Sequence, residues 1–281
     1  MPSPIVLTAF GTTSHARKTY EVMDRIIRKE FSGHEIYWAF SSRMVRDRLI
    51  KKKTFEIKHP HEVLQALSDK GHVWAVVQSL HLLCGHEFYR LLDEVQTVSI
   101  RSSIGLPLLS SPEDYQNLAK TLAFEKVWQK EEAVVLVGHG TDHSSWSAYL
   151  ALETVCREVY GPRIFVGVLE GRPSQKEVLQ KVIQTKIQRI RLIPLMLVAG
   201  VHFYEDLTEG EDSWRAAFEA VGLEVQVEPQ GIGVRSEVIQ IFVDHIRAAL
   251  DIIPAADNRY SQNVSGRLPV IDPSRQVSGI G

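Results

Sequence analysis

Short apolar runs alternate along this chain with longer amphipathic runs, and this alternation restricts the fold more than any other feature of the sequence. Several of the short runs are unbroken stretches of Val, Ile and Leu, the composition of parallel strands that helices cover on both faces. We predict eight strands from these runs, over residues 5–10, 35–40, 73–79, 106–109, 133–137, 164–168, 190–197 and 223–227. The alternation therefore favours an α/β fold with parallel sheets.

Amphipathic segments between these runs have the spacing of helices with one buried face. They predict helices over residues 14–29, 42–52, 61–70, 87–96, 112–128, 145–160, 174–184, 213–221 and 237–250. Five of these helices have a serine where an N-cap belongs, namely Ser14, Ser42, Ser145, Ser174 and Ser213. A serine hydroxyl at that position accepts a hydrogen bond from a free N–H of the first helical turn.

The two halves of the chain echo each other. Residues 195–204 repeat the pattern of residues 80–89, and a Gly-Thr turn follows an apolar run at both Gly11 and Gly140. The separation of these matches suits duplication of a whole βα domain better than a short repeat. We therefore expect two similar Rossmann-like lobes and a tail: an N-terminal α/β lobe over 1–125, a C-terminal α/β lobe over 126–250 and an extended, Pro- and Ser-rich tail over 251–281.

The echo breaks at two histidines. His139 stands where the first half has Phe10, and His202 stands where it has Glu87. Glycines on both sides of His139 permit a sharp turn at the carboxyl end of a strand, where open α/β sheets place their sites. The alternative is a histidine that only caps the next helix, a role for which His143 is equally suited. The second half is thus predicted to carry the chemistry.

A carboxylate, Glu170, follows the apolar run at 164–168. A charged group at such a strand end is costly unless it faces a polar cleft or a partner, which favours a functional role. His139, Glu170 and His202 then lie at three strand ends of one half, and such a ligand set suits divalent Zn, Co, Ni or Fe. The acidic residues at 204–212 offer cation ligands or proton acceptors, but for most of them we favour a solvated loop and helix start.

Composition and motifs argue against several other classes of protein. The 281 residues carry a formal net charge of −2, which provides no global attraction to nucleic acid or to an anionic membrane. Neither a nucleotide nor a zincin site is expected, because GxGxxG, GxxxxGK[ST] and HExxH are missing. Cys84 and Cys156 lie in apolar segments, as reduced thiols do. With no signal pattern at the first residues and no apolar run near the roughly 20 residues of a membrane span, we expect a cytoplasmic protein.

With these positions assembled, the chain resembles the anaerobic cobalt chelatases of the CbiK type, class II tetrapyrrole chelatases that insert Co²⁺ into sirohydrochlorin. The resemblance covers residues from about Ile5 to Leu250. It is carried by Thr8-Ala9-Phe10-Gly11-Thr12, Gln78-Ser79-Leu80-His81, Gly105-Leu106-Pro107-Leu108-Leu109-Ser110-Ser111, Gly138-His139-Gly140, Pro194-Leu195-Met196-Leu197-Val198-Ala199-Gly200 and Asp212-Ser213-Trp214. It implies a bilobal α/β fold with the macrocycle bound in the cleft between the lobes.

The resemblance also implies the roles of individual residues. The two metal-site histidines of the family correspond to His139 and His202, and its glutamate corresponds to Glu170. Co²⁺ is then a substrate in cobalamin synthesis, and no nucleotide is required. Because sirohydrochlorin carries eight carboxylates, local cations are expected from Arg17, Arg43 and Arg46. Contacts with the macrocycle are expected from Phe10, Arg43, Leu80, His81, Leu82, Leu83 and Glu87, with Glu87 also a candidate proton acceptor across the cleft from His202.

The sequence alone leaves open the metal, the distinction between an enzyme and a carrier, and the number of chains in the assembly. Two histidines and one glutamate do not separate Co²⁺ from Fe²⁺ or Ni²⁺, which would serve sirohaem or nickel tetrapyrrole synthesis. A non-catalytic carrier of metal or tetrapyrrole would bind through the same residues without turnover. The number of chains in the assembly is also open, and a homo-oligomer is compatible with the sequence.

Overall fold

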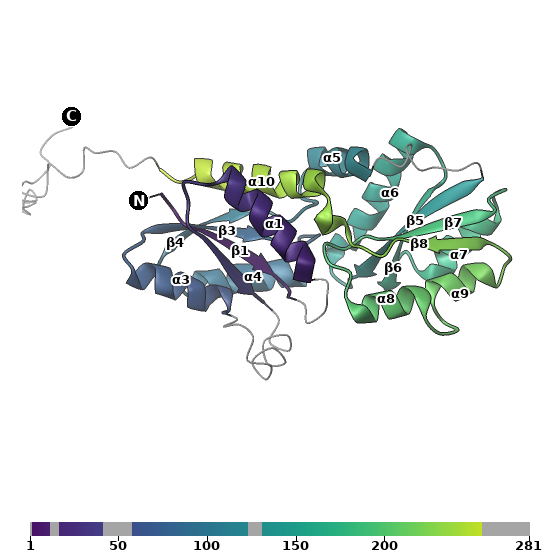
Figure 1. Cartoon of the computed structure of the whole chain (residues 1–281), viewed down its shortest axis with the longest axis horizontal. Coiled ribbons are helices and arrows are strands. Elements are labelled where there is room, and N and C mark those ends of the chain that lie inside the picture. Colours follow the sequence, from purple (N-terminus) through teal and green to yellow (C-terminus); the bar gives the residue numbers. More distant parts are fainter. Residues whose placement is uncertain (1, 12–16, 42–57, 123–130, 255–281) are drawn as a thin grey trace, which may run out of the picture.

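The structure is a computed structural model that describes residues 2–11, 17–41, 58–122 and 131–254, without the side chains of Arg17, Val201, His202 and Tyr204. The helix predicted at 42–52, the end of the helix predicted at 112–128 and most of the tail lie outside these residues. The described chain forms two lobes, each built on a four-stranded parallel sheet (Figure 1). The first sheet consists of β1 (Ile5–Ala9), β2 (Ile36–Phe40), β3 (Trp74–Ser79) and β4 (Arg101–Gly105). The second consists of β5 (Glu132–Gly140), β6 (Ile164–Glu170), β7 (Arg189–Pro194) and β8 (Glu224–Val227).

The two sheets confirm the predicted α/β fold and have the same topology. The strand order is β2-β1-β3-β4 in the first and β6-β5-β7-β8 in the second. Equivalent backbone hydrogen bonds follow the central strands: Leu80 N–H donates to Thr8 O, and Leu195 N–H donates to Val137 O, both at 2.7 Å. The echo in the sequence thus corresponds to two lobes of one topology.

Helices cover both faces of each sheet, so the central strands are buried except at their ends. In the first lobe, α3 (Pro60–Asp69) and α4 (His86–Gln96) share a core with the inner strands, and α1 (Arg17–Glu30) lies on the opposite face (Figure 1). In the second lobe, α6 (Ser147–Tyr160) covers one face, and α7 (Gln175–Ile183), α8 (Val201–Thr208) and α9 (Trp214–Glu219) cover the other. Burial of both faces explains why these strands read as continuous apolar runs.

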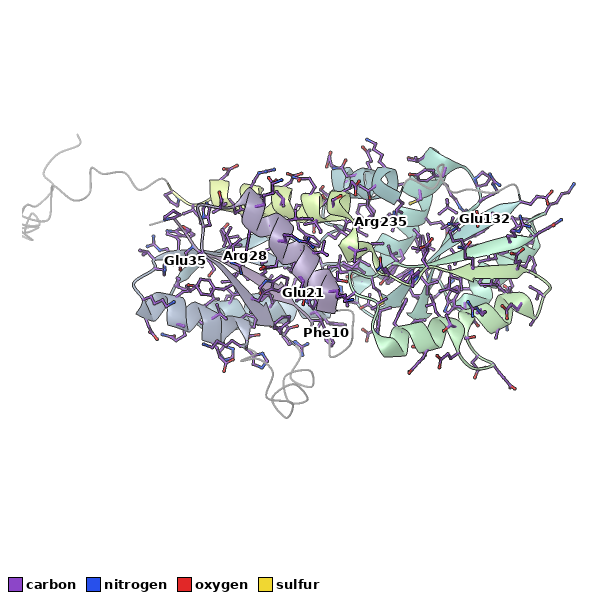
Figure 2. The ribbon with its side chains drawn as sticks, in the orientation of Figure 1. Phe10, Glu21, Arg28, Glu35, Glu132 and Arg235 are labelled. Atoms are coloured by element: carbon purple, nitrogen blue, oxygen red, sulfur yellow. The ribbon has the colours of Figure 1, made fainter. Side chains whose placement is uncertain are left out.

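Two helices cross between the lobes and do not follow the division predicted near residue 125. Helix α5 (Pro112–Leu122) precedes that boundary but packs against α6 of the second lobe. Helix α10 (Ser236–Asp251) follows it but returns to pack on β3 and β4 of the first sheet (Figure 1). At the crossing, Arg235 Nη1 donates to Leu122 O at 3.2 Å, and Figure 2 shows Arg235 between the lobes. The chain therefore joins the lobes twice.

The strand predicted at 106–109 is wrong. The fourth strand is Arg101–Gly105, and the apolar residues that follow it form the loop to α5. Leu108 and Leu109 are buried in the core, although they do not belong to the strand. The apolar run therefore reflects burial of a loop and not pairing in the sheet. The true strand is polar at Ser103, whose hydroxyl is buried and donates to Ala249 O of α10 at 2.6 Å. Because the polar Ser103 is buried by a helix far along the chain, local apolar periodicity does not identify this strand.

Helix α8 was not among the predicted elements, although the sequence 204–212 was expected to include a helix start. It begins after Gly200 and buries Phe203 and Leu207, which are four residues apart on one helical face. Asp206 and Glu209 are exposed, as expected of a solvated acidic segment. No helix in the described part of the chain is long and apolar enough to cross a membrane.

The N-cap predictions are confirmed at two serines and wrong at a third. Ser174 and Ser213 accept hydrogen bonds from the first turns of α7 and α9. Ser145 does not cap α6. Instead His143 precedes a short 3₁₀ helix, η2 (Ser144–Trp146), and its Nδ1 accepts from Ser145 N at 3.1 Å. His143 therefore has the capping role that the sequence left open.

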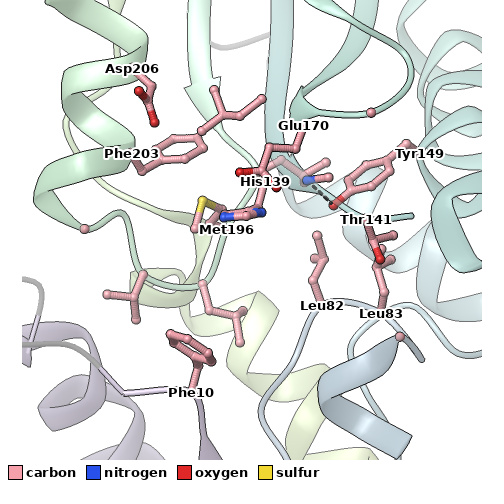
Figure 3. A pocket seen from close by; sticks show the side chains of 18 of the residues that line it. Phe10, Leu82, Leu83, His139, Thr141, Tyr149, Glu170, Met196, Phe203 and Asp206 are labelled. Atoms are coloured by element: carbon pink, nitrogen blue, oxygen red, sulfur yellow. Dashed lines mark hydrogen bonds between the residues drawn. The ribbon is translucent and has the colours of Figure 1, made fainter. Parts of the chain in front are cut away.

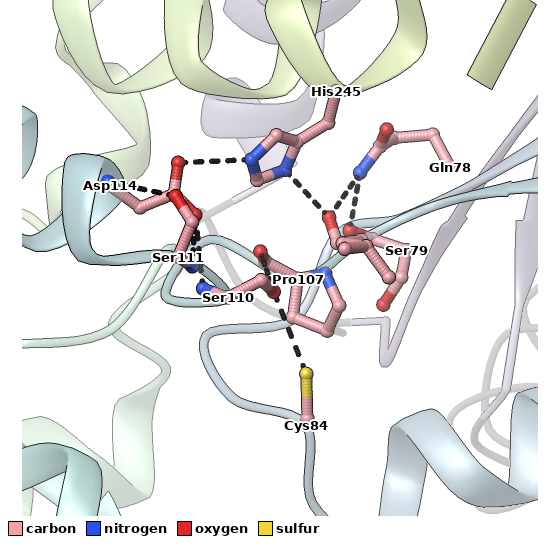
Figure 4. A network of polar contacts seen from close by, with 9 residues as sticks. Gln78, Ser79, Cys84, Pro107, Ser110, Ser111, Asp114 and His245 are labelled. Carbon is pink, nitrogen blue, oxygen red and sulfur yellow. Dashed lines mark hydrogen bonds and ion pairs between the residues drawn. The ribbon is translucent and has the colours of Figure 1, made fainter. Parts of the chain in front are cut away.

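A polar network fastens α5 and α10 to the loop after β4 (Figure 4). His245 of α10 lies 3.0 Å from Asp114 through Nε2 and 2.9 Å from Leu106 O through Nδ1. Both ring nitrogens therefore face oxygen atoms of the first lobe and of α5. The other Asp114 oxygen accepts from the backbone of Ser110 at 3.0 Å and of Ser111 at 2.7 Å. One buried carboxylate thus links a helix cap to the helix that crosses back from the second lobe.

Replacing this carboxylate is expected to destabilise the fold. Asp114→Ala removes an acceptor from two backbone N–H groups and from His245, and should lower the free energy of unfolding by about 2 to 4 kcal/mol. Urea denaturation of the full chain measures this loss. The matched control is Glu113→Ala, in the same helical turn but exposed, with an expected change within about 0.5 kcal/mol. Equal losses in the two variants would contradict a structural role for the network.

Candidate active site between the lobes

A pocket of about 1410 Å³ lies between the lobes, lined by the carboxyl ends of strands from both sheets. It exceeds the roughly 300–1,000 Å³ of an ordinary small-molecule site. The first lobe contributes every described residue that was predicted to contact the macrocycle: Phe10, Leu80, His81, Leu82, Leu83 and Glu87. Arg43 lies outside the described residues. The pocket has the size and the mixed apolar lining of a site for a large, flat ligand.

His139 and Glu170 come together on the second-lobe wall of this pocket. Parallel pairing of β5 with β6 sets Gly138 beside Val168 and Gly140 beside Glu170, so the two side chains leave neighbouring strand ends. Both are exposed and both line the pocket. Figure 3 shows them on one side of it, with Phe10, Leu82 and Leu83 on the other. The structure therefore brings two of the three predicted metal ligands to one place.

The glycines that flank His139 are required by close packing. A Cβ atom at Gly140 would lie 1.8 Å from Glu170 O, and the Gly140 backbone has φ +97°, a conformation that other residues rarely adopt. A Cβ atom at Gly138 would lie 2.5 Å from Tyr149 Cε1. The backbone on either side of His139 therefore packs closely, at Gly140 against β6 and at Gly138 against Tyr149 of α6.

The third predicted ligand, His202, is in the first turn of α8 after the N-cap Gly200. Phe203 and Asp206 of the same helix line the pocket, so α8 begins at its wall. Among the side chains that the structure describes, no three His, Cys, Asp or Glu groups form a metal-binding cluster. The side chain of His202 lies outside that set, so the three-ligand site stays a prediction.

Glu87 is held in place on the first-lobe side of the pocket. It forms an ion pair with Arg90, one turn later in α4, and accepts a hydrogen bond from Ser41 Oγ at 3.2 Å. The hydrogen bond that Arg90 donates to the Glu87 carboxylate raises the pKa of Arg90. These contacts orient a carboxylate at the pocket wall before any ligand is present.

His81 lines the pocket as a largely buried imidazole. Burial lowers its pKa to about 4, so the ring is neutral near pH 7. Its Nδ1 lies 2.8 Å from Ser79 Oγ, whereas Nε2 is buried with no hydrogen-bond partner. The second lobe has Met196 at the same position, because His81 O accepts from Leu108 N and Met196 O accepts from Ile232 N. The two pocket walls therefore differ at equivalent positions.

The described wall of the pocket is acidic. Its second-lobe side includes the carboxylates of Asp142, Glu170, Asp206, Glu209, Glu211 and Asp212. None of the described lining residues is Lys or Arg. The side chains of Arg17, Arg43 and Arg46, the cations expected for the macrocycle, are outside the described part of the chain. The described wall thus attracts a divalent cation and repels carboxylates.

Sequence reasoning missed the residues that join the two pocket walls and support the His139 turn. His86 Nε2 contacts Asp142 Oδ1 at 2.8 Å across the lobes, and this hydrogen bond lowers the pKa of Asp142. Tyr149 accepts a hydrogen bond from Gly140 N at 3.2 Å (Figure 3). A signal for Tyr149 was available in the echo, since Tyr20 and Tyr149 each follow the glycine of a Gly-Thr turn by nine residues.

The packing at Gly140 predicts a large cost for any added side chain. Gly140→Ala should destabilise the chain both through its positive φ and through the clash with Glu170 O. Gly161→Ala is the matched control, since Gly161 also has a positive φ of +83° but no atom within 4 Å of an added Cβ. The control should lose about 1 kcal/mol, and Gly140→Ala about 1 to 3 kcal/mol more, measured by denaturant unfolding. Equal losses would show that contact with β6 does not select glycine here.

Comparison with known proteins identifies relatives along nearly the whole chain. The family model described as Cobalt chelatase (CbiK) matches residues 3–251. The sirohydrochlorin cobaltochelatase of Salmonella typhimurium is 29% identical over 259 residues, which cover 90% of this chain and 98% of that protein. The sirohydrochlorin cobaltochelatase CbiKC of Nitratidesulfovibrio vulgaris is 31% identical over 260 residues, covering 89% of this chain and 91% of that protein.

Solved structures support the same fold. The sirohydrochlorin chelatase SirB from Bacillus subtilis subspecies spizizenii, in complex with cobalt, aligns with a TM-score of 0.61 at 16% identity, covering 89% of this chain and 96% of that one. SirB from Bacillus subtilis with Fe³⁺ aligns with a TM-score of 0.62 at 17% identity, covering 93% and 98%. At these identities the likeness concerns the fold alone. Because the family model spans residues 3–251 and a relative at 31% identity covers most of its length, the chain belongs to the cobalt chelatase (CbiK) family.

Proposed function

We propose that this chain is a sirohydrochlorin cobaltochelatase, which inserts Co²⁺ into sirohydrochlorin and releases two protons in the anaerobic route to cobalamin. The observation that carries this proposal is the meeting of His139 and Glu170 in a large pocket between two lobes. Membership of the cobalt chelatase family and two relatives named sirohydrochlorin cobaltochelatase give the reaction its metal and its macrocycle. The reaction changes no oxidation state and is proposed to occur in the cytoplasm without a nucleotide.

His139 and His202 bind Co²⁺ as neutral imidazoles, and Glu170 supplies negative charge that offsets the dication as it loses water. His139 is equivalent to Phe10 of the first lobe, and His202 is equivalent to Glu87. This ligand set is therefore proposed for the second lobe alone. The acidic groups beside Glu170 raise the local concentration of a divalent cation. The metal thus approaches the macrocycle from the second lobe.

The macrocycle lies against the apolar residues of the first lobe. Phe10 is 45% exposed at the pocket wall, and Leu82 and Leu83 line the first-lobe side of the same pocket (Figure 3). Burying this apolar surface against the flat ring favours binding in one orientation. The peripheral carboxylates point away from the acidic wall, and Arg43 is the cation proposed to bind them.

Insertion breaks two pyrrole N–H bonds, and the two protons must be accepted as the nitrogens coordinate Co²⁺. Glu87 is the proposed acceptor of one proton on the first-lobe side, since Arg90 and Ser41 hold its carboxylate at the pocket wall. The second proton passes to Glu170 or to an imidazole on the opposite face of the ring. A general base needs hydrogen-bond reach to the proton that it removes. Ligands on one face of the ring and a base on the other complete the exchange without redox chemistry.

The test of the metal site is an insertion assay with sirohydrochlorin and the purified full chain, followed by absorbance. His139→Ala and His202→Ala should each lower the rate of Co²⁺ insertion by more than the roughly 100-fold that loss of an outer-shell group costs. His143→Ala is the matched control, because this histidine of the same loop caps η2 and should leave insertion near the original rate. Normal insertion by both site variants would contradict the assignment.

The same assay distinguishes the alternatives. Repeated turnover identifies an enzyme, whereas capture of one equivalent identifies a carrier. Initial rates with Co²⁺, Fe²⁺ and Ni²⁺ rank the metals, and faster insertion of Fe²⁺ or Ni²⁺ at equal free metal would contradict cobalt as the substrate.

A second variant tests the proton acceptor. Glu87→Gln keeps the size of the side chain and an acceptor for Ser41 but removes the basic carboxylate. We expect kcat to fall by about 10²- to 10⁴-fold, with KM for Co²⁺ changed by less than about threefold. Glu94→Gln is the control on the same helix, since Glu94 faces His61 outside the pocket. An unchanged kcat for Glu87→Gln would assign the proton to another group.

A further inference from the structure

We propose that Tyr149 is a positioning residue for metal binding, whose hydroxyl fixes the turn that carries His139 and thereby sets the affinity of the site for Co²⁺. The inference rests on the proposed function, in which His139 is a metal ligand. It concerns a residue that makes no direct contact with the metal and acts only through the backbone of its neighbour.

Tyr149 supports both sides of the His139 turn from α6. Its side chain is only 2% exposed, and its hydroxyl accepts a hydrogen bond from Gly140 N at 3.2 Å. Its ring fills the space where a Cβ atom at Gly138 would be. Burial raises the pKa of Tyr149, which keeps the hydroxyl neutral near pH 7. One side chain therefore contacts the residues before and after His139.

The first lobe shares the hydrogen bond between glycine and tyrosine, with Ala9 and Phe10 in place of Gly138 and His139. The Gly11 N–H donates to the hydroxyl of Tyr20, and Gly11 has φ +102° against +97° for Gly140. Tyr20 lies at the start of α1, as Tyr149 lies at the start of α6. This turn presents Phe10, which the proposed function places against the macrocycle. Thus the tyrosine and the glycine are shared by the lobes, whereas the residue that they position is not.

The shared arrangement separates positioning from folding. If each tyrosine only stabilised its lobe, removing either hydroxyl would have the same kind of effect on turnover. If each positions the residue before its glycine, loss of the Tyr149 hydroxyl affects the metal and loss of the Tyr20 hydroxyl affects the macrocycle. A buried N–H left without an acceptor is costly, so the turn shifts to satisfy it and carries the presented side chain with it.

The experiment compares Tyr149→Phe with Tyr20→Phe in the full chain. Steady-state insertion is measured with each substrate varied in turn, and Co²⁺ binding is measured without macrocycle from the visible absorption of the bound ion. Tyr149→Phe should raise KM for Co²⁺ and weaken Co²⁺ binding about tenfold, with KM for sirohydrochlorin within about twofold of the original value. Tyr20→Phe should raise KM for sirohydrochlorin and leave Co²⁺ binding unchanged.

Each outcome decides between the two roles. Unchanged Co²⁺ binding by Tyr149→Phe, or an equal loss of kcat in both variants with no split in KM, would overturn the inference. If Tyr149→Phe does not fold, 3,5-difluorotyrosine at position 149 keeps the ring and weakens the oxygen as an acceptor, and it should shift Co²⁺ binding in the same direction. Failure of the unaltered chain to insert Co²⁺ would count against the proposed function. Insertion by that chain together with unaltered Co²⁺ affinity in the variant would count against this inference alone.

Discussion

Burial of both faces of the central strands is the constraint on which the rest of the structure depends. All five residues of β1 and the first seven of β5 are buried, so neither strand can present a charged group to solvent along its sides. Chemically active residues are therefore confined to the strand ends. Both sheets direct their carboxyl ends into the same pocket, and two buried frameworks thus create one shared site.

Duplication of this framework allows equivalent positions to diverge without a change of fold. Strand order, the hydrogen bond that follows the central strand and the positive φ of the turn glycine are the same in both lobes. At the pocket wall, Phe10 is equivalent to His139, and His81 is equivalent to Met196. Each lobe keeps its geometry because the buried strands determine it, and the exposed strand-end residues are free to differ. A symmetric pocket thereby acquires one wall suited to a metal ion and one suited to a ring.

The sequence predicted what depends on local periodicity and missed what depends on distant contacts. Seven of the eight predicted strands lie at or within two to three residues of observed ones. The paired ends of β5 and β6 place His139 and Glu170 on neighbouring strand ends, and their role as metal ligands stays a prediction. The fourth strand was misplaced because α10, far along the chain, covers its polar Ser103. The return of α10 to the first sheet is likewise a tertiary contact that no local pattern encodes. The support of Gly140 by Tyr149 is also a tertiary contact, and only the comparison of the two halves offers a signal for it.

Charge explains why an asymmetric pocket suits the proposed reaction. Its two substrates carry opposite charge, a dication and a macrocycle with eight carboxylates, so a uniformly charged pocket would repel one of them. The described lining has six carboxylates on the second-lobe side. On the first-lobe side it has Glu87, whose charge is balanced by an ion pair with Arg90. In the proposed function, a cation that approaches along the acidic second lobe reaches His139 and Glu170 without crossing the carboxylated rim of the ring. Under this proposal the duplicated fold separates the two routes of approach, because the carboxylates that attract the cation lie on one lobe and the exposed apolar Phe10 lies on the other.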